Sequence, residues 1–422
     1  MQYDVIVAGT GPGGASAARG LSDQGAKVLM LEWGGGDAFN GSQAQSLSMI
    51  GVPGKNILVT PEALIVGRAT TVGGSTSLYC ATAFNPPLEM LQRVGVDISR
   101  EAEEIKGDLP CATLDDSLVG QGASRLMDSA QSLGYDWQKL QKFIYQEKCR
   151  LGCYKCYTGC PYGAKWTARN FVEQATEAGA TLLTRARVRR VIVRRKQAAG
   201  VVFHHEGRDK RAYAPVVILA AGGLGTPVIL RRTGIQEAGY DFFVDPLVIA
   251  FGVTEDFEGG GEVPMTAGMH LEEGIMLTDL ALHPSVYRGF SAQIMRFDKV
   301  FSHKRVLGIM VKIRDDLGGR LTDYGGVRKY LGKADWKRLD KGYHVARKVL
   351  KRAGATECFK SWNIAGHPGG TAKIGDVVDA NLMTRYDSLY VCDCSVIPEA
   401  WGVPPSYTLA CLGKRLSRRL CA

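Results

Sequence analysis

The chain has 422 residues, 45% of them hydrophobic, and carries a formal net charge of +10. This length predicts roughly two to three domains, and the composition allows a large buried core. No apolar run approaches the ~18 residues of a membrane-spanning helix and no signal region precedes the first strand, so we expect a cytoplasmic protein. The basic runs 185–196 and 414–419 match no nucleic-acid-binding motif, which argues against nucleic acid as a partner.

Residues 4–34 predict a strand, a tight turn, a helix and a second strand. Gly9, Gly11 and Gly14 form G-x-G-x-x-G: the first turns the chain, the second lets backbone approach a pyrophosphate, and the third lets the helix pack on the strand. The helix N-terminus attracts the phosphates, and Glu32, which ends the second strand, is placed to bind a ribose hydroxyl. The segment therefore predicts a dinucleotide site.

Further glycine doublets follow in the chain, at 73–74, 222–223 and 369–370. Such doublets are typical of backbone that approaches a ligand closely. If these later segments return to the site of residues 4–34, the pattern is that of a flavoprotein. We therefore favour FAD over NAD as the dinucleotide.

A run of four cysteines, "KCRLGCYKCYTGCPYGAK" (148–165), has the spacing C-x3-C-x2-C-x3-C-P. Thiolates at this spacing are typical of an iron-sulfur cluster, 4Fe-4S with four ligands or 3Fe-4S with three. A structural zinc site has overlapping spacings and stays open as an alternative, as do plain buried cysteines. In a reducing compartment the 11 cysteines indicate metal or redox use, not disulfides. The predicted ligands are Cys149, Cys153, Cys156 and Cys160.

The second half of the chain predicts further strands and helices. "VVILAAGG" (216–223) is typical of a parallel-sheet strand. "FFVDPLVIAFGV" (242–253) and "VLGIMVKIRDD" (306–316) predict strands of an antiparallel sheet, and residues 341–355 predict an amphipathic helix that ends at Gly354. The closing segment contains "GHPGGT", whose His367 suits a general base with a pKa near neutrality.

Four segments together resemble the glucose-methanol-choline (GMC) family of flavin oxidoreductases. They are residues 3–34, "GRATTVGGSTSLYCATAF" (67–84), "ILAAGGLGTPVILRRTGI" (218–235) and the closing segment 366–416. The resemblance implies an α/β fold: a Rossmann-like FAD-binding domain with an inserted α+β substrate domain that carries an antiparallel sheet. It implies FAD contacts from Gly9, Gly11, Gly13, Gly14, Glu32, Arg68, Gly73, Gly74, Ser75, Thr76, Val188, Ala221, Gly222, Asp393 and Pro405.

The cysteine run narrows this resemblance to an iron-sulfur branch of the family, that of the bacterial FAD-dependent glucose dehydrogenases. The branch implies a cluster that carries electrons from the flavin to an external acceptor. A ferredoxin or cytochrome is then an expected partner, and the basic runs of the chain are either a patch for such an acidic redox protein or solvated faces.

The catalytic centre implied by the resemblance departs from the family at one position. His367 matches the catalytic histidine, but the family places Asn or His just before a proline near the end, where this chain has Pro404 in "VPPSYT". Proline has no polar side-chain atom, so the second partner is missing or comes from elsewhere. Asn363 is our choice, with Tyr79 and Tyr407 as further candidates.

The predicted organisation is discontinuous. The FAD-binding domain takes residues 1–85, 166–240 and 365–422, the substrate domain takes 86–148 and 241–364, and the cysteine loop takes 149–165. We expect a dehydrogenase that oxidises a CH–OH group of a sugar, polyol or other alcohol by hydride transfer to flavin N5, with electrons leaving through the cluster. The alternatives are a ferredoxin-fed enzyme that reduces a C=C or C=O bond, an oxygen-using oxidase and a non-enzymatic FAD protein.

Overall fold

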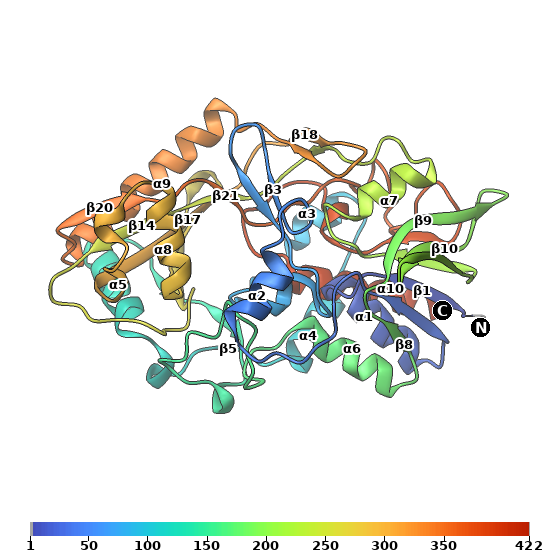
Figure 1. The fold of residues 1–422 in the computed structure, drawn as a ribbon, viewed down its shortest axis with the longest axis horizontal. Coiled ribbons are helices and arrows are strands. Elements are labelled where there is room, and N and C mark those ends of the chain that lie inside the picture. The colour runs from blue at the N-terminus through green and yellow to red at the C-terminus, as the bar shows by residue number, and fades with distance from the viewer. Residues whose placement is uncertain (1–2, 422) are drawn as a thin grey trace.

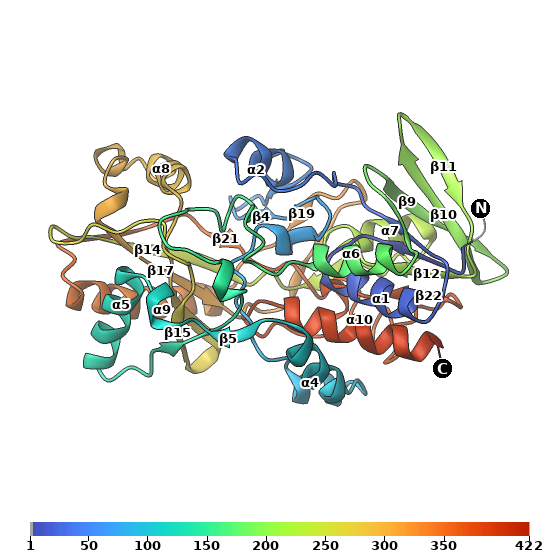
Figure 2. The same ribbon diagram turned by 90° about the horizontal axis from the view of Figure 1, so that it is seen from below.

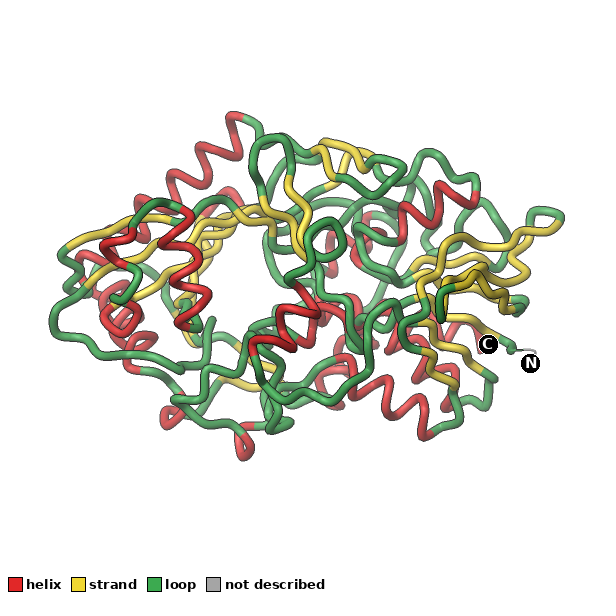
Figure 3. The backbone as a smooth tube through the Cα atoms, viewed as in Figure 1, coloured by secondary structure: helices red, strands yellow, loops and turns green. Residues whose placement is uncertain are grey.

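The computed structural model describes residues 3–421 and has two lobes along its long axis (Figure 1). One lobe contains a parallel sheet and both ends of the described chain. The other contains a large, mostly antiparallel sheet, and the strands of the two lobes form separate groups (Figure 3). This mixed α/β architecture confirms the predicted fold class.

The parallel sheet has five strands in the order β22–β12–β1–β2–β8. Every neighbouring pair in it is parallel. All four residues of β1 and of β2 are buried, as expected of strands covered on both faces. The strands are β1 (Val5–Ala8), β2 (Val28–Leu31), β8 (Thr181–Leu183), β12 (Val216–Leu219) and β22 (Leu389–Val391).

Helices α1 (Pro12–Asp23), α6 (Ala168–Glu177) and α10 (Ser406–Cys421) pack together on this sheet (Figure 2). The buried face of α1 consists of small residues, so α10 comes unusually close: a Cβ on Gly413 would lie 2.3 Å from the carbonyl oxygen of Gly13. The end of the chain therefore supports the first helix.

A second, antiparallel sheet lies beside the parallel one. Its strands are β9 (Arg187–Arg194), β10 (Gln197–His205) and β11 (Arg208–Ala212). Strand β10 packs against β12, and helix α7 (Thr226–Thr233) packs against β9.

The large sheet has nine strands in the order β3–β4–β21–β14–β17–β16–β15–β6, with β20 also paired to β14. Its pairs are antiparallel except β21 with β4. Helices α5 (Gln121–Ser132) and α9 (Lys333–Arg352) pack on its strands. The strands are β3 (Ile57–Val59), β4 (Ile65–Gly67), β6 (Gln138–Lys139), β14 (Pro246–Val253), β15 (Ala267–Leu271), β16 (Ile275–Asp279), β17 (Val306–Ile313), β20 (Glu357–Lys360) and β21 (Ile364–Ala365).

The two lobes share a segment, because β3 and β4 lie in the first part of the chain yet belong to the large sheet. The predicted domain boundaries themselves stay predictions.

No helix among residues 3–421 is long and apolar enough to cross a membrane. The remaining elements are α2 (Gln43–Ile50), α3 (Leu88–Arg93), α4 (Ser99–Asp108), α8 (Pro284–Gln293), β5 (Cys111–Thr113), β7 (Gln141–Phe143), β13 (Tyr240–Phe242), β18 (Gly318–Leu321), β19 (Val327–Arg328), and 3-10 turns at Gly74–Ser77, Asp116–Leu118, Gln146–Lys148, Glu272–Gly274, Phe297–Lys299, His303–Arg305 and Cys394–Val396.

Candidate active site

The loop between β1 and α1 is built by glycines with different tasks. Gly9 has a φ of +107°, and a Cβ there would lie 2.2 Å from the carbonyl oxygen of Ala220 on the neighbouring strand. A Cβ on Gly14 would lie 2.3 Å from the carbonyl oxygen of Gly9, so this glycine lets the helix approach. Gly11, at the N-cap of α1, has nothing within 4 Å of a Cβ. Its open backbone at a helix N-terminus fits a pyrophosphate.

The Gly73–Gly74 turn lies against this loop. Both residues have positive φ, and a Cβ on Gly74 would lie 3.0 Å from the Cα atom of Gly11. The backbone N–H of Gly73 donates to the hydroxyl of Thr10 at 3.3 Å. The structure therefore brings together the first two segments that the sequence connects with FAD. The next residues fix the turn: Ser75 Oγ accepts from the N–H of Ala69, and Thr76 Oγ1 accepts from the N–H of Ala168.

Glu32 holds the same loop from the end of β2. Its buried carboxylate accepts from the N–H and hydroxyl of Thr10 at 3.1 and 2.7 Å, and from the N–H of Gly34 at 2.7 Å. Burial raises the pKa of Glu32, and these hydrogen bonds oppose that rise. Glu32 therefore positions the turn around Thr10, while its contact with a ribose stays a prediction.

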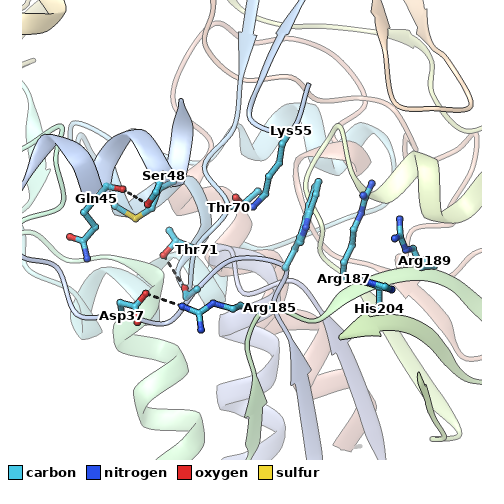
Figure 4. Close-up of a pocket in the computed structure, with 13 residues that line it drawn as sticks. Asp37, Gln45, Ser48, Lys55, Thr70, Thr71, Arg185, Arg187, Arg189 and His204 are labelled. Atoms are coloured by element: carbon cyan, nitrogen blue, oxygen red, sulfur yellow. Dashed lines mark hydrogen bonds and ion pairs between the residues drawn. The ribbon is translucent and has the colours of Figure 1, made fainter. Parts of the chain in front are cut away.

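A cavity of about 490 Å³ opens beside Trp33, directly after Glu32 (Figure 4). Its wall is strongly basic: it contains Lys55, Arg185, Arg187 and Arg189 and one carboxylate, that of Asp37, which pairs with Arg185 at 3.4 Å. These cations come from separate segments, and the glycine motif gives no signal of them. The other residues of the wall are Trp33, Gly35, Gln45, Ser48, Met49, Thr70, Thr71 and His204.

Within residues 3–421, the cations around Trp33, which are Lys55, Arg68 and Arg187, form no ion pair with a carboxylate. The guanidinium of Arg187 lies 4.0 Å and that of Arg68 lies 5.0 Å from the centroid of the Trp33 ring. Burial, followed by the repulsion of neighbouring cations, lowers the pKa of both arginines to about 10. A cavity that concentrates positive charge next to the dinucleotide loop fits the adenosine phosphate end of FAD. The residues present therefore fit the cofactor.

The second and closing segments meet at Asp393. This buried carboxylate accepts from the N–H of Gly222 at 2.8 Å, from the hydroxyl of Thr226 at 2.5 Å, and from the N–H and hydroxyl of Ser395. The preceding residue, Cys392, approaches the first turn of α1 closely: a Cβ on Gly13 would lie 2.2 Å from the carbonyl oxygen of Cys392. Asp393 thus fixes the segment around Ala221 and Gly222 at the start of α1. Val188 is buried in β9, and Pro405 is buried at the start of α10.

The candidate base, His367, lies at the same end of the large sheet as two buried charged residues. Its Nδ1 atom is 2.9 Å from Nζ of Lys312 and 3.2 Å from Oδ2 of Asp245, and those two atoms are 3.7 Å apart. Lys312 lies on β17, Asp245 precedes β14, and His367 follows β21. The side chains of Lys312 and Asp245 are 1% exposed, whereas that of His367 is 26% exposed.

The electrostatics of this trio favour a neutral imidazole. Burial, and then the neighbouring ammonium, hold the pKa of His367 well below its ordinary value. Burial also lowers the pKa of Lys312 to about 8 and raises that of Asp245 to about 6, although each opposes the shift of the other. Within residues 3–421, Nε2 of His367 has no hydrogen-bond partner. A neutral ring with one engaged and one free nitrogen can exchange a proton with a substrate.

The structure does not bring the other catalytic candidates into contact with His367. The carbonyl of Asn363 accepts from the N–H of Ile65 at 3.4 Å, and its side chain makes no hydrogen bond in the described part of the chain. The hydroxyls of Tyr79 and Tyr407 donate to the carbonyls of Trp166 and Ala102. The role of Asn363 stays a prediction.

The sequence analysis missed Lys312 and Asp245. Each is an ionisable residue inside or beside an apolar strand: lysine in "IMVKI" and aspartate in "FFVDPLVI". An ionisable side chain in such a run is rarely buried without a partner, so each could have been marked as half of a buried pair. Which residues pair could not be read from the runs alone.

The cysteine loop lies next to the Gly73–Gly74 turn. The ammonium of Lys165 donates to the carbonyls of Ser77, Tyr79 and Cys156 at 3.0, 2.9 and 2.8 Å. All four thiols are free, and burial, followed by the neighbouring Cys153, raises the pKa of Cys149. Nevertheless, no three His, Cys, Asp or Glu side chains in residues 3–421 are arranged to hold a metal ion. The predicted set of Cys149, Cys153, Cys156 and Cys160 is thus not assembled as a metal site.

Comparison with known proteins identifies the family. The model described as "GMC oxidoreductase" matches residues 4–247 with its N-terminal part and 327–413 with its C-terminal part. The uncharacterized protein MJ1450 of Methanocaldococcus jannaschii is 27% identical over 99% of this chain and 100% of its own length. Long-chain-alcohol oxidase FAO1 of Arabidopsis thaliana is 24% identical over 100% of this chain and 67% of its own length.

The fold is also that of a solved structure. The crystal structure of pyridoxine 4-oxidase from Mesorbium loti has a TM-score of 0.75 and covers 99% of both chains at 16% identity. Together the family model covers well over half of the chain, including the dinucleotide loop and the segment of His367. The chain therefore belongs to the GMC oxidoreductase family, whose members are FAD-dependent oxidoreductases that act on CH–OH donors.

Proposed function

We propose that the chain is a dehydrogenase that oxidises a CH–OH group, with His367 taking the hydroxyl proton. The observation that carries this proposal is the neutral imidazole whose Nδ1 is held by Lys312 and Asp245 and whose Nε2 is free. Bound FAD would supply the hydride acceptor at flavin N5. A general base needs a free lone pair within reach of the reacting oxygen. A neutral histidine with a free ring nitrogen meets this requirement.

The residues of the FAD-binding lobe would hold the cofactor in three places. The open backbone of Gly11 and the N-terminus of α1 would bind the pyrophosphate. The basic cavity beside Trp33 would take the adenosine end, and the Gly73–Gly74 turn would lie against the flavin ring. The contacts predicted for Arg68, Val188, Ala221, Asp393 and Pro405 belong to this proposal.

The substrate class is an alcohol in the broad sense: a sugar, a polyol or a simple alcohol. Two proteins similar to this chain are named for a long-chain alcohol and for pyridoxine, both of which carry a CH–OH group. These molecules and a set of sugars therefore form the first substrate panel.

The test is anaerobic reduction of the FAD-bound protein by each member of the panel, followed through flavin absorbance. A substrate should bleach the flavin of the wild type, and His367→Gln should lower the rate ~10²–10⁴-fold with the flavin still bound. The exposed His344 on α9 provides the control, since His344→Gln should leave the rate unchanged. Full bleaching rates in His367→Gln would contradict the assignment.

We further propose that the cysteine loop holds an iron-sulfur cluster and passes electrons to an external acceptor protein. The spacing of Cys149, Cys153, Cys156 and Cys160 supports this, as does the tie between the loop and the Gly73–Gly74 segment through Lys165. The buried ammonium groups of Lys165 and Lys142 also suit an anionic centre. Because the thiols are not gathered in a metal geometry, cluster insertion would have to rearrange the loop.

Protein purified without oxygen should contain iron and acid-labile sulfide and absorb broadly near ~400 nm. Cys153→Ser and Cys160→Ser should lose the iron, whereas Cys421→Ser, an exposed cysteine at the end of α10, should retain it. Zinc without iron in the wild type would support the zinc alternative and remove the proposed electron exit.

Reduction of a C=O or C=C bond with electrons from ferredoxin is the second candidate. Pro404 favours it, because the partner that usually shares the substrate hydroxyl is missing. So does the ammonium of Lys312 behind His367, since a proton can be delivered as well as removed by that pair. A flavin potential well below that of the alcohol/carbonyl couple would favour this direction.

A further inference from the structure

Lys312 is buried, charged at neutral pH in its ordinary state, and directed at a histidine. In the described chain its Nζ atom meets Nδ1 of His367 at 2.9 Å and one carboxylate oxygen of Asp245 at 3.7 Å. The ammonium of a purely structural buried lysine is expected to donate its hydrogen bonds to carbonyls or to a close carboxylate. This lysine instead faces a nitrogen that can either accept or donate a proton.

The imidazole can carry a proton through its ring only if it does not stay doubly protonated. Burial and the neighbouring ammonium make the imidazolium costly, as the lowered pKa of His367 reflects. A route in which one nitrogen gains a proton while the other loses one avoids that species. Nδ1 faces Lys312, and Nε2 is free on a side chain that is 26% exposed.

We propose that Lys312 is the final proton acceptor of the oxidation, acting through His367. This proposal rests on the function proposed above. The hydroxyl proton of the alcohol moves to Nε2 while the Nδ1 proton moves to the lone pair of neutral Lys312, so His367 changes tautomer and stays neutral. The C–H bond would break with its electron pair, for which FAD, when bound, would supply the hydride acceptor, and the alcohol would leave as a carbonyl compound.

The proposal gives the hydroxyl proton a destination inside the protein, beyond the nitrogen that receives it. Lys312 comes from β17 of the substrate lobe, far in sequence from the closing segment, and it does not touch the substrate in this scheme. It is therefore a positioning residue for His367 and a store for one proton. In the reverse direction the same pair would deliver that proton to a carbonyl oxygen.

The first test is the pH dependence of anaerobic flavin reduction, with the alcohol that reduces the wild type as probe. The rate should rise with pH as Lys312 loses its proton, which its pKa of about 8 places in the accessible range. The ionisable groups that act on Lys312 are His367, Asp245, Asp315, Cys394 and His270.

Lys312→Met should lower the reduction rate ~10²–10⁴-fold, leave the dissociation constant of the alcohol unchanged and flatten the pH profile. Lys312→Arg should be as slow, because a guanidinium stays protonated and cannot accept. Lys312→Ala should also be slow, and added ethylamine, which fits the space left by the shortened side chain, should restore its rate in proportion to the free-base fraction of the amine. Lys341→Met is the control: Lys341 lies exposed on α9 and pairs with Glu273, away from Lys312, so its loss should leave the pH profile unchanged.

The second test needs no substrate. In FAD-bound protein labelled with ¹⁵N-histidine, the ring nitrogens of His367, assigned with His367→Gln, should report a neutral ring whose signals change as Lys312 titrates. Lys312→Met should abolish that change.

These outcomes separate the two proposals. If no alcohol reduces the wild type, the proposed function fails while the nitrogen signals still test the pair. Reduction of Lys312→Met within threefold of the wild type would overturn the relay and leave the function intact. Rescue by arginine would also overturn it, because the charge alone would then suffice. Nitrogen signals insensitive to Lys312 would overturn it as well.

Discussion

Two buried lysine–aspartate pairs lie in the same lobe, and their surroundings differ. Lys329 is 3.0 Å from Asp315 and also donates to the carbonyls of Phe242 and Asp316 at 2.8 and 2.6 Å. Lys312 is 3.7 Å from Asp245, and within residues 3–421 no backbone carbonyl accepts a hydrogen bond from it. Both lysines are 1% exposed, so burial alone does not distinguish them.

The difference separates a structural pair from a reactive one. Asp315 accepts from the N–H groups of Val244 and Asp245, so the Lys329 pair ties three backbone segments together. The Lys312 pair ties no backbone segment through its ammonium and instead faces His367. A buried charge with few partners costs stability, and its place beside the candidate base gives it a chemical task.

The largest effect on stability is expected from Lys329→Met. The change removes the cation that neutralises the buried Asp315 and the donor to two carbonyls, so unfolding free energy should fall by ~3–5 kcal/mol. Urea unfolding of the FAD-bound protein measures it. A loss below ~1 kcal/mol would contradict the structural role of the Lys329–Asp315 pair.

Lys312→Met should cost less, ~1–3 kcal/mol, because Asp245 and His367 lose the ammonium but stay 3.2 Å from each other, and no backbone carbonyl loses a donor. Asp245 can then take up a proton, since burial already raises its pKa to about 6. The same urea experiment, run in parallel, gives the difference between the two lysines. An equal or larger loss than in Lys329→Met would make Lys312 a structural residue too.

The two aspartates should leave a mark on the pH dependence of stability. Burial raises the folded-state pKa of Asp245 and Asp315 to about 6, above the ordinary 3.8. Between these values the folded state binds more protons than the unfolded state, so each group lowers stability as pH rises from 4 to 6. The slope is at most ~1.4 kcal/mol per pH unit for one full proton. Subtracting the unfolding curves of Asp245→Asn from those of the wild type should isolate this slope, and a difference that does not vary with pH would contradict it.

Lys312 should have the opposite effect on the pH dependence of stability. Its folded-state pKa of about 8 lies below the ordinary 10.5, so the folded state binds fewer protons between these values and stability rises with pH. Lys312→Met should lose this rise.

The smallest effect is expected at an exposed pair of the same lobe. Lys341 on α9 and Glu273 are 3.0 Å apart, with side chains 41% and 51% exposed. Water screens such a pair, so Lys341→Ala should leave the urea midpoint unchanged within error. A clear loss would show that burial is not what sets the two inner pairs apart.

The sequence predicts the FAD-binding lobe better than the catalytic trio. Gly9, Gly11 and Gly14 are dictated by backbone contacts within one short unit, so their spacing is enough to locate the loop. The pairing of Lys312 with Asp245 depends instead on the register of β14 with β17, where Leu247 lies opposite Lys312. The residue types of each strand do not determine which residues lie opposite one another.

The basic cavity and the cysteine loop show two further limits. The cavity gathers cations from the segment after α2 and from β9 with the residues before it, and none of these belongs to a motif. For the cysteines, the spacing names a possible ligand set but does not fix whether the thiols converge. Ligand identity is local in sequence, whereas convergence depends on the packing of the loop against its neighbours.

The order of strands in the parallel sheet has a consequence for biosynthesis. The central strand β1 is made first, yet its neighbour β12 follows some two hundred residues later, and the edge strand β22 and the supporting helix α10 are made last. On the ribosome the early strands must therefore wait, with apolar surface exposed, for partners that have not been synthesised. The parallel sheet can therefore reach its complete strand order only after β22 has been synthesised.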